Sequence, residues 1–210
     1  MVGVDILGLL ISLGLLLVAM TVHEFAHGAT AYLLGDHTAK DSGRLTLNPL
    51  AHIDPVGTII LPLLLFFSTN GRFVFGSAKP VPIDYRLLRN PRRDIIWIGI
   101  SGPAANFILA LICSLVLRFF PVSGLGLYML EKLVVINVVL GVFNLIPIPP
   151  LDGSRVVMGL LPRELSYRYA LIEPYGFFVV MGLVLLGALD ILVWPAVGYI
   201  LAALGFNVRI

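Results

Sequence analysis

The chain has 210 residues, of which 59% are hydrophobic and 12% are charged, and its formal net charge is +2 at pH 7. Soluble domains carry about 25% charged residues, so this composition excludes an ordinary water-soluble domain and predicts a protein of the lipid bilayer. No basic cluster suggests nucleic acid, so no nucleic-acid partner is expected. The single cysteine, Cys113, excludes an internal disulfide.

Four hydrophobic runs reach or approach the roughly 20 residues that a helix needs to cross a bilayer. They are Ile6–Leu34, Ile95–Phe120, Leu125–Ile146 and Tyr175–Val193. The first lacks the positive flank and cleavage site of a signal peptide and is predicted to be a retained span. A fifth run, Pro195–Phe206, is short, and its crossing stays open. We therefore predict an all-α polytopic membrane protein with about 4–6 membrane segments, forming a single domain over residues 1–210.

The run Val56–Phe67 has 12 residues and contains Pro62. It is too short for an ordinary span and fits a re-entrant segment. The loops on either side of it hold eight of the fourteen basic residues, and loops rich in Lys and Arg face the cytoplasm. Counting spans from these loops places the N-terminus outside and the segment from Arg155 to Arg168 inside. Three basic residues are left outside or at an interface: Arg118, Lys132 and Arg209.

The sequence His23-Glu24-Phe25-Ala26-His27 lies in the first predicted span and matches H-E-x-x-H. Positions i and i+4 share a helix face, so both imidazoles can bind one zinc ion, and Glu24 can take a proton from water. Ionisable residues inside a span are costly and usually functional, which disfavours a cluster that only braces helices. A catalytic zinc usually has three protein ligands, so a third must come from elsewhere in the chain.

Asp152 is the predicted third ligand. It follows a segment with three prolines, Asn144-Leu-Ile-Pro-Ile-Pro-Pro-Leu, in which a regular helix is disfavoured. Irregular backbone at membrane depth is tolerated only where protein or a water-filled cavity shields it, and such a break can turn a carboxylate toward a neighbouring helix. A helix cap is the alternative role. The predicted topology puts Asp152 and the C-terminal end of the first span on the same side of the membrane.

Three blocks of sequence together resemble the site-2 protease family of intramembrane zinc metalloproteases. They are His23 to Gly28, Ser101-Gly-Pro-Ala-Ala-Asn106, and Asn144 to Gly153, which fits N-x-x-P-x-P-x-L-D-G. The similarity covers a catalytic core of about residues 6–161, and the C-terminal membrane segments span about residues 175–206. No PDZ-like or nucleotide-binding domain is recognised, as in the compact form of the family.

The resemblance implies one Zn²⁺ per chain, held by His23, His27 and Asp152, with Glu24 as general base and proton shuttle. It implies that Asn144 lies beside the zinc and holds the substrate or the developing oxyanion. A hydrogen bond between helices is the alternative role for Asn144. The implied activity is hydrolysis of transmembrane protein substrates at or near the cytoplasmic side of a prokaryotic plasma membrane.

A zinc transporter or metal-binding membrane protein is the alternative function. Transport predicts polar residues along a route through several spans, whereas here the predicted ligands gather at one depth. A protease of the type that trims prenylated C-termini would instead take a Glu as its third ligand.

Several polar or small residues have weaker assignments. His52 and Asp54 are candidate gate residues or hydrogen-bond partners of the ligands, although a role in turns is favoured. Gly102 is expected to permit close helix packing. The segment Phe73–Ser77 is expected to form a strand or short hairpin that could hold an unwound substrate by backbone pairing.

Overall fold

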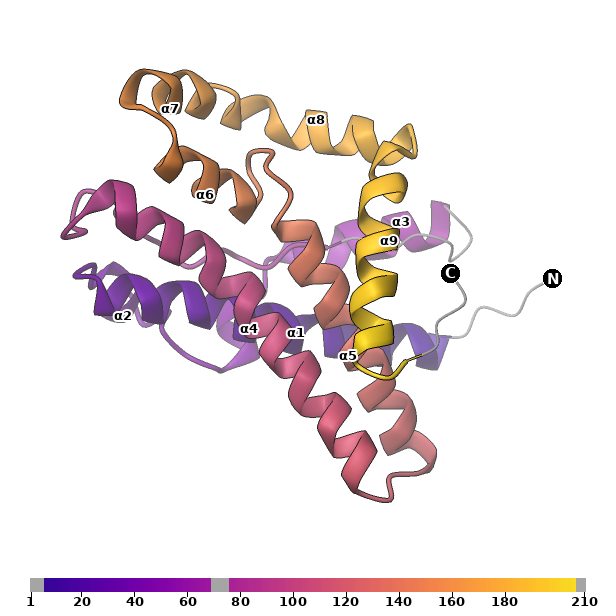
Figure 1. Ribbon diagram of the computed structural model, residues 1–210. Coiled ribbons are helices and arrows are strands. Elements are labelled where there is room, and N and C mark those ends of the chain that lie inside the picture. Colours follow the sequence, from indigo (N-terminus) through magenta and orange to yellow (C-terminus); the bar gives the residue numbers. More distant parts are fainter. Residues whose placement is uncertain (1–5, 69–75, 207–210) are drawn as a thin grey trace.

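The computed structural model describes residues 6–68 and 76–206, and every regular element within them is helical (Figure 1). Within these two ranges, three helices are long and apolar enough to cross a membrane: α1 (Ile6–Leu33), α4 (Pro91–Phe119) and α5 (Gly124–Asn144). Helix α4 packs against both α1 and α5. The all-α membrane fold is confirmed, with three candidate spans, or four if a bent helix pair near the C-terminus forms one more.

The ends of these long helices follow from proline positions. Helix α4 begins at Pro91, which fits the first turn because no backbone N–H is needed there. Helix α5 ends at Asn144, just before the three prolines, and Leu145–Leu151 forms turns. This irregular segment brings the chain back toward α4, where α6 (Asp152–Leu160) begins.

Short elements lie between α1 and α4. They are α2 (Thr38–Asp41), η1 (Pro49–His52), the π-helical η2 (Pro55–Ile60) and α3 (Leu61–Ser68). The predicted re-entrant run Val56–Phe67 falls on η2 and α3, and together these are too short for an ordinary span. Of the expected strand Phe73–Ser77, residues 73–75 lie outside the described part, and Gly76 and Ser77 form no strand.

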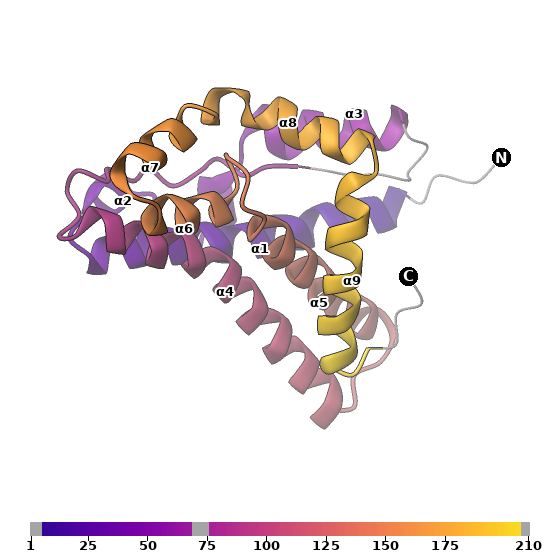
Figure 2. The ribbon, with the colours of Figure 1, turned by 45° about the horizontal axis from the view of Figure 1, so that its top comes forward.

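The C-terminal part differs from the predicted spans. Helices α7 (Arg163–Ala170), α8 (Glu173–Leu185) and α9 (Ala188–Ala203) follow α6, and the bend between α7 and α8 is 65°. The single span predicted over Tyr175–Val193 is wrong, because the chain turns at Gly187, whose φ is +68°. Only glycine adopts this left-handed conformation readily. The predicted run Pro195–Phe206 is therefore the second half of α9 and the turn that follows it, and α9 crosses the direction of α8 (Figures 1 and 2).

Two glycines allow α6 to begin close to α4. A Cβ at Gly99 of α4 would lie 2.8 Å from the carbonyl oxygen of Asp152, and a Cβ at Gly153 would lie 2.2 Å from that of Leu145. Neither position has room for a methyl group, since Cβ contacts with backbone below 3.0 Å require the chain to shift. The start of α6, and with it the Asp152 side chain, is thereby held against the middle of the bundle.

We expect Gly153→Ala to lower the free energy of unfolding by about 1–3 kcal/mol, because the added methyl group overpacks a backbone contact. Thermal unfolding in detergent with a chelator present measures this without a contribution from bound metal. The control is Gly182→Ala in α8, where nothing lies within 4 Å of the added Cβ. Equal stability of the two variants would contradict the packing argument.

Candidate metal centre

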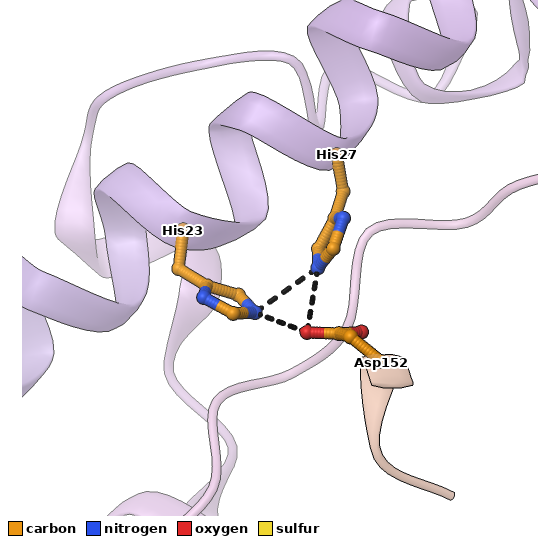
Figure 3. Close-up of side chains that lie close together, drawn as sticks. All are labelled: His23, His27 and Asp152. Atoms are coloured by element: carbon orange, nitrogen blue, oxygen red, sulfur yellow. Dashed lines mark hydrogen bonds and ion pairs between the residues drawn. The ribbon is translucent and has the colours of Figure 1, made fainter. Parts of the chain in front are cut away.

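Three ligand atoms converge between α1 and the start of α6 (Figure 3). The Nε2 atoms of His23 and His27 lie 3.0 Å apart. The Oδ2 atom of Asp152 lies 2.9 Å from Nε2 of His23 and 3.2 Å from Nε2 of His27. Both imidazoles are buried and the carboxylate is mostly buried, so the sequence-predicted ligands come together away from water.

Hydrogen-bond acceptors on α4 fix the tautomer of both imidazoles. Nδ1 of His27 lies 2.7 Å from the carbonyl oxygen of Ile98, which can only accept, so this nitrogen carries the proton. Nδ1 of His23 lies 2.6 Å from Oδ1 of Asn106. That oxygen is also an acceptor, because the amide nitrogen of Asn106 donates elsewhere. In the neutral rings both Nε2 atoms are therefore unprotonated.

The facing Asp152 carboxylate makes this arrangement unsuited to a hydrogen-bond cluster. Two unprotonated nitrogens and an ionised carboxylate are all acceptors, and they point at one another. Oδ2 of Asp152 is buried and accepts no hydrogen bond from any described residue. A cation among the three atoms satisfies all of them at once.

The site also contains an open space on the side of α4, because Gly102 has no side chain there. A Cβ at Gly102 would lie 2.4 Å from Nε2 of His27 and 2.6 Å from Nε2 of His23. The missing methyl group therefore leaves open the volume onto which both nitrogens point. Ile98, Gly102 and Asn106 are four residues apart, so one face of α4 orients both imidazoles and leaves room between them.

The donor set and its dimensions fit zinc. Two imidazoles and one carboxylate form a three-ligand set of the kind that catalytic zinc uses. Tetrahedral ligands about 2.0 Å from zinc lie roughly 3.3 Å from one another. The three observed separations, 3.0, 2.9 and 3.2 Å, come within about 0.4 Å of that value.

Asn106 is itself held in place by Asn137 of α5. The amide nitrogen of Asn106 donates to the carbonyl oxygen of Ala19 at 3.1 Å and to Oδ1 of Asn137 at 2.7 Å. The amide nitrogen of Asn137 donates to the carbonyl oxygen of Leu133, which fixes the orientation of Asn137 as well. Both asparagines are fully buried. A chain of hydrogen bonds thus runs from α5 through α4 to His23.

Glu24 is half-buried on the same turn of α1, beside the ligands. Its Oε2 atom accepts a hydrogen bond of 2.8 Å from the backbone N–H of Val81, in the extended segment before α4. The same segment is held at Asp84, whose N–H donates to Asp36. It then reaches Tyr85, whose ring lies under the Arg155 guanidinium and whose pKa is raised by burial. The segment therefore covers the side of α1 that carries Glu24.

The other candidate residues are not brought to the ligand atoms by any described contact. Asn144 is the last residue of α5 and donates its amide nitrogen to the carbonyl oxygen of Leu140. His52 is buried and donates from Nε2 to Thr46, and Asp54 caps η2 by accepting from the N–H of Gly57. Asp54 thus serves as a helix cap, and the turn-forming role favoured for His52 and Asp54 stays a prediction.

Comparison with known proteins places the chain in a family. Residues 123–186 match the family model described as Peptidase family M50. "Putative zinc metalloprotease YwhC" of Bacillus subtilis (strain 168) is 37% identical over 189 residues, which cover 86% of this chain and 82% of the relative. The chain belongs to peptidase family M50. The resemblance to the site-2 protease family is thereby confirmed, and this M50 chain is a peptidase.

Other relatives of this M50 peptidase differ more in length. "Putative zinc metalloprotease Rip2" of Mycolicibacterium smegmatis (strain ATCC 700084 / mc(2)155) is 32% identical over 83% of this chain and 66% of its own length. "Zinc metalloprotease MJ0392" of Methanocaldococcus jannaschii is 36% identical over 77 residues, which cover 37% of this chain and 23% of the relative. No solved structure matches the chain.

We expect Gly102→Ala to abolish stoichiometric zinc binding, because its methyl group would occupy the space between the two Nε2 atoms. Zinc per chain after purification and dialysis is the measurement. The control Gly14→Ala, on α1 with nothing within 4 Å of the added Cβ, should keep its zinc. Full zinc content in Gly102→Ala would contradict the assigned role.

We expect Asn137→Leu to weaken zinc affinity about tenfold, as outer hydrogen-bond partners of metal ligands commonly do. The substitution removes one of the two acceptors that orient the Asn106 amide, leaving only the carbonyl oxygen of Ala19, and so loosens the contact of Asn106 with Nδ1 of His23. Competition with a chelating dye measures the affinity. The control is Ser114→Ala, which removes a buried hydroxyl of α4 that donates to the carbonyl oxygen of Leu204. This variant should leave zinc affinity unchanged.

Proposed function

We propose that this protein is a zinc-dependent intramembrane endopeptidase that hydrolyses peptide bonds of transmembrane substrates at or near the cytoplasmic side of a prokaryotic plasma membrane. The observation that carries the proposal is the convergence of His23, His27 and Asp152 on the space left by Gly102, with Glu24 on the same turn of a helix long enough to span. Residues 1–210 act as one catalytic unit in this proposal.

The metal would be held by Nε2 of His23, Nε2 of His27 and a carboxylate oxygen of Asp152. Zinc supplies a Lewis acid and lowers the pKa of water to about 7. Burial of the ligands keeps bulk water away, which strengthens electrostatic interactions with a substrate carbonyl. The hydrogen bonds that the imidazoles donate to Ile98 and Asn106 keep both rings oriented throughout.

Glu24 is the proposed general base. Its carboxylate takes a proton from the attacking water as the new carbon–oxygen bond forms, and it gives that proton to the nitrogen of the leaving amine as the carbon–nitrogen bond breaks. The hydrogen bond from Val81 holds one carboxylate oxygen, Oε2, and leaves Oε1 for proton transfer. Asn144 is proposed to hold the substrate carbonyl oxygen through Nδ2, which requires its amide to leave the carbonyl of Leu140.

The cytoplasmic side is supported by the distribution of charge. Arg92 and Arg93 open α4, and Arg155 and Arg163 lie on α6 and α7, at the end of the bundle that carries the ligands. Basic residues collect on the cytoplasmic face of membrane proteins. A transmembrane substrate cut at this depth has its peptide bond near that face.

We expect Glu24→Gln to retain about one zinc per chain and to lose at least 100-fold in cleavage rate, the scale of a general base. Asp152→Ala should lose the metal as well as the activity. The measurement combines zinc content with cleavage of a panel of single-span peptides by protein in detergent. The exposed Glu164→Gln on α7 is the matched control and should keep both.

Two results would count against the proposal. If folded wild type bound no stoichiometric zinc after zinc is supplied, the assignment of a metal centre would be contradicted. Undiminished cleavage by Glu24→Gln would remove the assigned base.

A further inference from the structure

The end of the bundle away from the metal centre contains an open cavity of about 950 Å³. The residues that line it belong to the first half of α1, the end of α4, the first two thirds of α5 and the segment that follows α9. Ser12 in its wall precedes His23 by 11 residues, so roughly 16 Å of helix separates the cavity from the metal ligands. The cavity is thus a separate feature of the protein.

Two cations line this cavity, and neither forms an ion pair with any residue that the structure describes. Lys132 is half-buried, with Nζ 3.1 Å from Oγ of Ser12 and 5.0 Å from the centre of the Tyr128 ring. Arg118 lies one residue before the end of α4. Among residues 6–68 and 76–206, no carboxylate lies within 4.0 Å of either cation.

The position of Lys132 makes this lack of a counter-charge costly. It lies eight residues beyond the start of α5, roughly 12 Å along a membrane-spanning helix. An ionised side chain at such a depth is expensive unless it finds a partner. Glu131 also lines the cavity, but adjacent residues on a helix do not face each other. Among the described residues that line the cavity, the two cations and this carboxylate leave one positive charge in excess.

The charge pattern of the whole chain sets these residues apart. Eleven of the fourteen basic residues are expected at the cytoplasmic end, and only Arg118, Lys132 and Arg209 fall elsewhere. Arg118 and Lys132 come from different helices and line the same cavity. The remaining walls are mostly apolar and include Leu117, Val135 and Leu204, so the cavity combines a cationic rim with a surface for hydrocarbon.

We propose that this cavity binds an anionic phospholipid. The headgroup phosphate lies between Lys132 and Arg118, where it can also accept a hydrogen bond from the Tyr128 hydroxyl, and an acyl chain covers the apolar wall. The attraction is that of basic residues for anionic headgroups, which is best known from the cytoplasmic face of membranes and depends here on the same charges. A free phosphate ion shares the headgroup chemistry but cannot use the apolar wall.

The test uses the full chain in a zwitterionic detergent, with bound lipid counted by native mass spectrometry. Phosphatidylglycerol and phosphatidylcholine with identical acyl chains are titrated separately, and a third arm adds inorganic phosphate as a competitor. The variants are Lys132→Gln, Arg118→Gln and Leu127→Trp, which fills the cavity without changing charge. The exposed Arg163→Gln on α7 is the control for a general loss of positive charge.

We expect wild type to bind one phosphatidylglycerol in preference to phosphatidylcholine. Each Gln substitution should weaken this binding about fivefold, the contribution of one basic residue near an anionic headgroup. Leu127→Trp should weaken the binding of both lipids, and Arg163→Gln should change neither. Millimolar phosphate should not displace the lipid.

Three outcomes would overturn the proposal. Equal binding of the two lipids by wild type would show that the cavity does not recognise the headgroup. If Arg163→Gln weakened phosphatidylglycerol binding as much as Lys132→Gln does, the preference would be a general effect of positive charge. Displacement of the lipid by phosphate would assign the site to the free ion. None of these measurements depends on zinc or on cleavage, so the result stands apart from the proposed activity.

Discussion

Two neutral imidazoles present their unprotonated Nε2 atoms to one point because each ring donates from Nδ1 to an acceptor on α4. These acceptors are the carbonyl oxygen of Ile98 and Oδ1 of Asn106. If either were lost, a ring could carry its proton on Nε2 and would offer a donor where a lone pair is needed. The rest of the bundle preserves this arrangement: α5 orients Asn106 through Asn137, and α6 brings the Asp152 carboxylate to close the third side.

The three side chains that the structure brings together can be predicted from the sequence because the patterns that carry them are local. H-E-x-x-H puts both histidines on one face of a helix whatever the surrounding fold, and the three prolines before Asp152 break the chain where a ligand is needed. The order of the apolar runs likewise predicts α1, α4 and α5 to within a few residues. These features depend on periodicity and on backbone restrictions that a single sequence carries.

The features that a single sequence does not predict are those that depend on contacts between distant segments. In the sequence, Asn106 is the last residue of a small-residue motif and Asn137 is one polar residue in an apolar run, so neither pattern indicates a contact with a histidine. Their hydrogen bonds exist only because three helices cross at one place. The break at Gly187 cannot be predicted from the sequence, because a glycine within an apolar run is compatible with a continuous helix. Its left-handed conformation depends on how α8 and α9 pack.

The absent side chain of Gly102 has a consequence for interpreting related sequences. All metal-binding atoms can be present in a chain, and a single carbon atom at this position would still fill the space between them. Such a chain would retain the histidines and the aspartate, and we would nevertheless expect it to bind no metal at this place. The presence of every ligand is therefore an incomplete criterion for an active relative, and the residue that faces the two histidines from the neighbouring helix has to be inspected with them.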